Sequence, residues 1–135
     1  MAFIWEARGG FALGGQETRW GAILWGGVAG LLGAALLALA WALLIRWGGL
    51  AEGPSLKAAH YSGYFLALWA GGVAARRAGA RGWFHGALGG LFYGLAAAAL
   101  SLLMFSTAVS LGPFLADMGL ALFLGVLGGI LALNL

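Results

Sequence analysis

Two ionisable side chains inside apolar stretches are the first candidates for chemistry in this sequence. Asp117 lies in the run that starts near Pro113, and His85 lies in the run that starts near Gly82. Ionisable residues within membrane segments often mark functional sites. If these runs cross a membrane, they enter it from opposite sides, so about 18 Å of a core of about 30 Å separates the two side chains. We therefore expect no acid–base pair within one chain.

Asp117 is at the same depth as three other polar residues, Arg46, Lys57 and His60, near the ends that we assign below to the outside. We expect a structural ion pair or hydrogen bond there, assisted by the positive end of the helix that carries Asp117. A proton or cation site is the alternative. His85 is interpreted as an inner-interface residue bonded to backbone or lipid rather than as a ligand. It falls on the opposite face from His60, which disfavours bis-histidine haem.

Other catalytic arrangements are missing from the sequence. There is no cysteine, so thiolate nucleophiles, thiolate metal sites and disulfides are excluded. Metal-ligand spacing is absent, and no serine is placed beside a histidine. Ser101, Ser106, Thr107 and Ser110 cluster near the end of the third apolar run, where they can satisfy backbone groups without a catalytic role. We therefore expect no enzyme activity, no metal and no cofactor.

The glycine-rich stretch from Gly71 to Gly94 contains three arginines, Arg76, Arg77 and Arg81. A dinucleotide-binding fingerprint would need a preceding strand and a later acidic residue, and a P-loop would need Gly-Lys-Ser/Thr. Neither pattern is present, and the stretch is instead typical of a tight turn between two helices. The arginines either act only as topology signals or form a binding site for anionic lipid headgroups.

The composition of the whole chain indicates that it lies in a membrane. Of 135 residues, 63% are hydrophobic and only 8% are charged, whereas soluble domains average about 25% charged residues. A soluble protein of this length has too little polar surface to cover so much apolar surface, and a bilayer removes that problem. The net charge of +3 is too small and too scattered for a nucleic-acid interface.

Four apolar runs predict four transmembrane helices arranged as two hairpins, at about 21–45, 58–75, 82–105 and 113–135. A helix needs about 20 apolar residues to cross the hydrocarbon core. With a cytoplasmic N-terminus, the inside would hold Arg8, Arg19 and the three turn arginines, and the outside would hold only Arg46 and Lys57. This distribution predicts an all-α integral membrane protein with both termini inside, N-in and C-in.

Aromatic residues agree with this orientation. They would mark an inner interface with Trp20 and Trp83 and an outer one with Trp41, Trp47, Tyr61 and Tyr64. Residues 1–19 are interpreted as a tail or a short interfacial helix, and residues 20–135 as the transmembrane domain. A weak similarity between residues 20–75 and 83–135 raises the hypothesis of a parallel internal repeat.

Glycine occurs 26 times and often at intervals of four residues. Residues four apart share a helix face, and small residues let helices approach closely in lipid. We interpret these rows as helix-packing faces, with a pore lined by exposed backbone as the alternative. The predicted packing residues are Gly26, Gly30, Gly71, Gly82, Gly86, Gly90, Gly94, Gly125 and Gly129.

The turn and the end of the chain also carry motifs that can be compared with a family. These motifs comprise Gly71, Gly72, Arg76, Arg77, Gly79, Gly82, Trp83, His85, Gly86, Gly90, Tyr93, Gly128, Gly129 and Asn134. In these residues the chain resembles the YrzE-like small membrane proteins of Gram-positive bacteria. The resemblance implies a four-helix plasma-membrane protein and supplies no activity. It also suggests an inner-face site that contains His85 and Tyr93, which are eight residues apart on one face of the third helix.

Three functions remain open from the sequence. The first is a non-catalytic, self-associating or accessory scaffold subunit, suggested by the glycine rows. The second is an oligomeric channel or small transporter with a polar site near Asp117. The third is an anionic-lipid-binding protein that uses the turn from Arg76 to Arg81. The expected partners are membrane lipids, further copies of the chain or other membrane subunits, and not nucleic acid.

Overall fold

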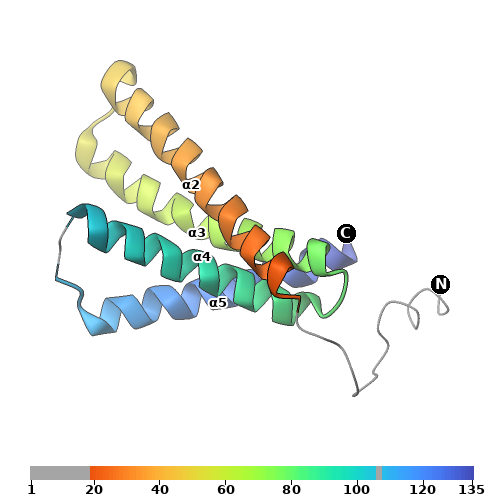
Figure 1. Cartoon of the computed structure of the whole chain (residues 1–135). Coiled ribbons are helices and arrows are strands. Elements are labelled where there is room, and N and C mark those ends of the chain that lie inside the picture. Colours follow the sequence, from red (N-terminus) through yellow and green to blue (C-terminus); the bar gives the residue numbers. More distant parts are fainter. Residues whose placement is uncertain (1–18, 106–107) are drawn as a thin grey trace.

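The computed structural model describes residues 19–105 and 108–135, and it is built from four long helices (Figure 1). In chain order these helices are α2 (Trp20–Gly48), α3 (Glu52–Ala78), α4 (Gly82–Phe105) and α5 (Leu111–Asn134). The described residues contain no strand. The predicted tail, residues 1–19, lies outside the described residues except for Arg19.

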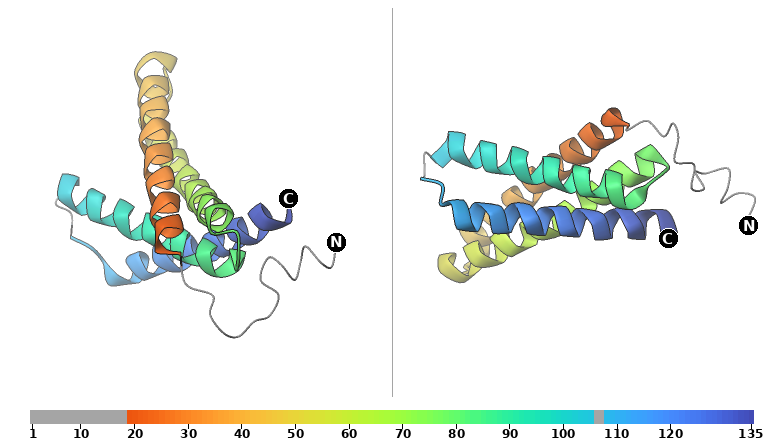
Figure 2. Two further views of the ribbon diagram at one scale, coloured as in Figure 1. Left: turned by 45° about the vertical axis from the view of Figure 1, so that its right-hand side comes forward. Right: turned by 90° about the horizontal axis from the view of Figure 1, so that it is seen from below.

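The four helices form two antiparallel hairpins, α2–α3 and α4–α5. Helix α3 packs against all three other helices, whereas α2 packs against α3 and α4 and does not touch α5. The hairpins lie close together at the end that holds the α3–α4 turn, here called the turn end. They spread apart toward the end that holds the α2–α3 and α4–α5 connections, here called the open end (Figures 1 and 2).

The turn end depends on two residues with left-handed backbone. Gly79 has φ 69° and its N–H donates to the carbonyl of Ala75 over 2.9 Å, which closes the last turn of α3. Arg81 has φ 46°, which is unusual for a residue with a side chain. Its carbonyl accepts the backbone N–H groups of Phe84 and His85, both over 3.0 Å, so the reversed backbone at Arg81 starts α4.

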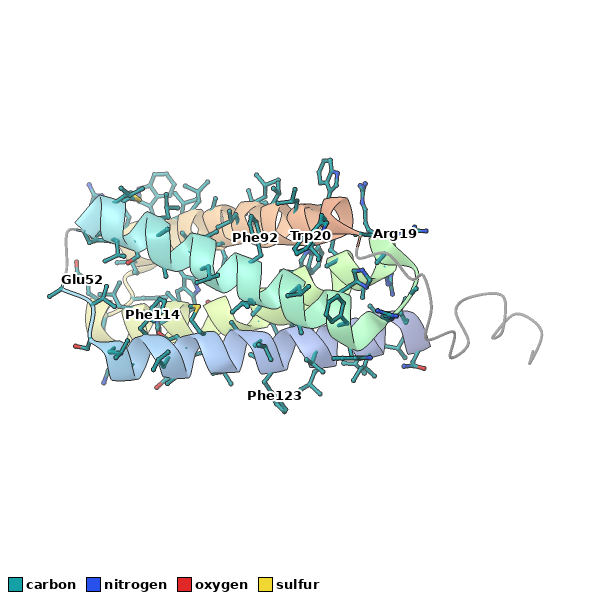
Figure 3. All side chains as sticks on the ribbon, turned by 60° about the horizontal axis from the view of Figure 1, so that its bottom comes forward. Arg19, Trp20, Glu52, Phe92, Phe114 and Phe123 are labelled. Atoms are coloured by element: carbon teal, nitrogen blue, oxygen red, sulfur yellow. The ribbon has the colours of Figure 1, made fainter. Side chains whose placement is uncertain are left out.

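The interior of the bundle contains small residues and the exterior contains large ones. Ala67, Ala70 and Ala74 are at most 1% exposed, and no large side chain is fully buried within the described residues. Phe65 is 69% exposed, and Figure 3 shows Phe123 pointing away from the bundle. This is the reverse of a water-soluble core, and it is the distribution expected when hydrocarbon surrounds the helices.

Three of the four helices are long and apolar enough to cross a membrane: α2, α4 and α5. The run 58–75, predicted as the second span, is helical as part of α3, but α3 is not among the three candidates. The reason lies in the run itself, since His60, Ser62 and Tyr64 and several glycines make its mean hydropathy lower than that of the other three helices, although it contains no charged aspartate, glutamate, lysine or arginine.

Glycines allow the helices to approach until their backbones are in contact. On α4, a Cβ added to Gly82 would lie 2.5 Å from the carbonyl oxygen of Gly129, and one added to Gly90 would lie 2.5 Å from that of Ala121. Between them, Gly86 faces Gly125. Such distances are closer than any real Cβ tolerates, so α4 and α5 can pack this closely only because these positions lack side chains.

The other predicted packing glycines also face neighbouring helices of the same chain. Gly26 and Gly30 of α2 pack against Ala70 of α3, and Gly30 also contacts the ring of Tyr93. Gly71 of α3 packs against the backbone of Gly125. The glycine rows that suggested self-association are therefore occupied within one chain, where they hold the bundle together.

Candidate functional site

A cavity of about 400 Å³ lies between α3, α4 and α5 toward the open end of the bundle. Its wall is mostly apolar and is formed by small or flexible residues, including Ala67, Gly94, Ala97, Met118 and Ala121. Its polar groups come from His60, Tyr64, Tyr93, Ser101, Ser110 and Asp117. Figure 3 places Phe114, another lining residue, at the same end as Glu52 and opposite to Arg19 and Trp20.

The position of the cavity follows from where the α4–α5 glycine contacts stop. Gly94 is the last glycine of α4 in this interface, and a Cβ there would lie 3.0 Å from that of Ala121. Beyond Gly94 the side chains of α4 that line the cavity are those of Ala97, Ala98, Ser101 and Leu102. As the hairpins spread apart toward the open end, these mostly small side chains do not fill the space between the helices.

A chain of hydrogen bonds joins three polar side chains of this cavity. The Tyr64 hydroxyl donates to Oδ1 of Asp117 over 2.6 Å, and it lies 3.2 Å from Nε2 of His60. Because the single Tyr64 proton is directed to Asp117, the Tyr64 oxygen accepts from His60, which assigns the proton to Nε2 of that imidazole. The carboxylate of Asp117, which belongs to α5, is therefore held in place by a side chain of α3.

The structure brings together only part of the predicted outer site. Asp117 and His60 both line the cavity and are linked through Tyr64. Arg46 and Lys57 are exposed and lie outside the cavity lining. Of the predicted ion pair or hydrogen bond to Asp117, the structure has the hydrogen bond, and its donor is Tyr64. The sequence indicates Tyr64 only as an interface aromatic, although its spacing of four residues from His60 places both on one helix face.

His85 lies at the turn end, where its ring connects two segments of backbone. It is 3% exposed, its Nε2 accepts the backbone N–H of Arg19 over 3.2 Å, and its Nδ1 lies 3.3 Å from the carbonyl of Arg81. Both contacts are satisfied at once by the neutral ring with its proton on Nδ1. His85 thus joins the start of α2 to the α3–α4 turn.

Tyr93 lies in the buried part of the cavity wall and has other contacts than His85. It is 7% exposed, its hydroxyl donates to the carbonyl of Gly63 over 3.3 Å, and its ring packs on Gly30. His85 and Tyr93 are therefore both buried, but they bind different parts of the chain. The structure does not bring them together as an inner-face site.

The arginines of the turn make contacts within the protein. Nε of Arg76 donates to the carbonyl of Ala132 over 3.2 Å, close to the C-terminal end of α5, where a cation is favourable. The guanidinium of Arg77 lies 4.5 Å from the ring centroid of Trp25, which is a cation–π distance. Arg81 is exposed and has the left-handed backbone described above.

The four helices and the residues of this cavity lie almost entirely within one family match. The model of a protein family described as "Protein of unknown function (DUF3792)" matches residues 19–132. This chain belongs to the DUF3792 family. The family description carries no activity, and no curated protein and no solved structure matches the chain.

The residues that line the cavity are suited to binding a small molecule. Within residues 19–105 and 108–135, no three side chains of His, Asp or Glu gather as a metal site. The cavity offers one carboxylate, which accepts a hydrogen bond from a phenol. It also offers an imidazole, two serine hydroxyls and an apolar wall. A few fixed polar groups in a mostly apolar cavity are the usual composition of a small-molecule site.

Proposed function

We propose that this chain is a multipass membrane protein that binds a small molecule, without catalysis, in the cavity at its open end. The observation that carries the proposal is the placement of the Tyr64–Asp117 pair on a mostly apolar cavity of about 400 Å³. Of the three functions suggested by the sequence, this one develops the polar site near Asp117. The YrzE-like resemblance, with a bacterial plasma-membrane location, belongs to the same proposal.

We propose further that α3 crosses the membrane as the fourth span. Its 27 residues extend about 40 Å at 1.5 Å per residue, which exceeds a hydrocarbon core of about 30 Å. Like α4, α3 packs against all three other helices, so part of its surface is covered by protein and does not need to be apolar to face lipid. Its acidic, lysine and arginine residues lie in the first six and last three positions. With the turn arginines inside, the open end and its cavity face outward.

Cysteine labelling tests the proposed cavity, because the natural chain has no cysteine. Ala97→Cys places a thiol in the cavity wall, and the matched variant Ala99→Cys places one on the exposed side of the same helix. In native membranes we expect 2-hydroxyethyl methanethiosulfonate to modify the Ala97→Cys variant and not the Ala99→Cys variant. A thiol surrounded by lipid does not form the reactive thiolate, whereas one in a hydrated cavity does.

A filled cavity provides the control. Ala98→Phe adds a large side chain to the cavity wall, so it should slow modification in the Ala97→Cys background. An unreactive thiol in the Ala97→Cys variant, or equal reactivity of the two cysteine variants, would show that this part of the chain is no accessible cavity and would overturn the proposed function.

A second candidate function, the self-associating or accessory subunit, draws on α2. Among the three helices that are long and apolar enough to cross a membrane, α2 is the least covered, since only 6% of its most apolar segment is buried within the chain. Leu36 of α2 is 69% exposed. Oxidative crosslinking should then give a dimer through Leu36→Cys and none through the control Phe123→Cys on α5. Monomer from both variants would argue against this role.

A further inference from the structure

We infer that the cavity selects organic monocations, such as protonated or quaternary amines with a compact apolar body. This inference rests on the proposed binding function and specifies its ligand class. The juxtaposition that carries it is a carboxylate, aromatic rings and an alanine-rich wall around one space of about 400 Å³.

The charge of the ligand follows from the surroundings of Asp117. Asp117 is half-buried, and its hydrogen bond from Tyr64 uses Oδ1 alone. Within the described residues no side-chain oxygen or nitrogen is buried without a partner, and these residues give Oδ2 no hydrogen bond, so Oδ2 is not fully buried and Asp117 can present it to a ligand in the cavity that it lines. Among residues 19–105 and 108–135, no lysine or arginine lines this cavity. A cation can therefore compensate the carboxylate, and an anion would be repelled.

Aromatic rings next to the carboxylate favour an ammonium group. Tyr64 and Tyr93 line the cavity together with Phe114. At its outer edge the rings of His60 and Tyr64 meet edge to face with centroids 5.4 Å apart. The faces of aromatic rings attract ammonium groups, including quaternary ones that donate no hydrogen bond.

The remainder of the cavity selects an organic rather than an inorganic cation. A bare metal ion needs several oxygen or nitrogen ligands, and the described residues contain no group of three such acidic or imidazole side chains. The wall of the cavity offers Ala97, Met118 and Ala121 instead. An apolar ligand body displaces water from this wall, which stabilises the complex in proportion to the apolar area that is covered.

The test uses two probes of the same shape and different charge. Benzyltrimethylammonium carries a quaternary nitrogen where neopentylbenzene carries a carbon. Each is added to the full-length Ala97→Cys chain in zwitterionic nanodiscs, and the rate of modification by 2-hydroxyethyl methanethiosulfonate reports occupancy. We expect the cation to slow modification in a saturable manner and the neutral probe to slow it far less.

Asp117→Asn identifies the group that is responsible. Asparagine keeps an acceptor for the Tyr64 hydroxyl, so the hydrogen bond that joins α3 to α5 can persist. The variant should weaken protection by the cation about tenfold or more, which is the size expected for the loss of a contact to a charged group, and should not alter protection by the neutral probe. Circular dichroism and unchanged reactivity without probe show that the variant is folded.

The outcomes separate the two proposals. If the thiol of the Ala97→Cys variant is reactive and the cation fails to protect it at millimolar concentration, or protects it equally well after Asp117→Asn, the ligand class is wrong and the cavity stands. Equal protection by both probes overturns the ligand class in the same way. If that thiol is unreactive, the proposed function itself fails.

Discussion

At the scale of single residues, hydrogen bonds from buried or half-buried polar side chains join separate parts of the bundle. Tyr64 joins α3 to α5, Tyr93 joins α4 to α3, and His85 joins the α3–α4 turn to the start of α2. The sequence indicated Asp117 and His85 because ionisable groups are rare in apolar runs, and the family resemblance indicated Tyr93. The sequence did not indicate their hydrogen-bond partners, which are backbone groups and the side chain of Tyr64. These partners lie on other segments, and residue spacing within one helix does not show how two helices are rotated relative to each other.

His85→Ala should destabilise the chain by about 1–3 kcal/mol, because it removes a ring that is only 3% exposed, and with it the acceptor for the N–H of Arg19 and the donor to the carbonyl of Arg81. The measurement is the midpoint of unfolding by sodium dodecyl sulfate in mixed micelles. The matched control His60→Ala removes an imidazole that is exposed, and it should shift the midpoint less. Equal shifts for the two variants would contradict the structural role of His85.

At the scale of helices, the four apolar runs predicted four helices, and the structure has helices at all four. The predicted limits of α4 agree closely with Gly82–Phe105, because a turn with Gly79 precedes it. The start of α3 was placed at residue 58 although the helix begins at Glu52. Its first residues are polar, and an apolar run marks only the part of a helix that lipid or protein covers.

The helix contacts also depend on particular glycines. Gly90→Ala should destabilise the bundle by about 1–3 kcal/mol, because the new Cβ would lie 2.5 Å from the backbone oxygen of Ala121 and the two helices would have to separate. Gly119→Ala, the same change on α5, meets nothing within 4 Å. It should leave stability unchanged or raise it by about 0.5–1 kcal/mol through helix propensity. Detergent unfolding of both variants measures the difference, and a loss at 119 as large as at 90 would contradict this account of the α4–α5 contact.

At the scale of the whole molecule, the cavity results from the way in which two hairpins meet. The glycines near the turn end bring the helices together, and small side chains beyond Gly94 leave space where the hairpins spread apart (Figure 2). The sequence predicted the two hairpins from their hydrophobic runs. It could not predict the angle between them, which depends on the summed packing of α3 against three neighbours, and so it did not predict a cavity.

The central claim is that α3 crosses the membrane and thereby places the turn end and the cavity on opposite sides. Single cysteines at Gly53 and Ala80, near the two ends of α3, test it most directly. In intact cells an impermeant maleimide should label Gly53→Cys, and it should label Ala80→Cys only after the membrane is permeabilised. Labelling of both positions from the same side would show that α3 does not cross, and it would contradict the proposed topology together with the outward-facing cavity.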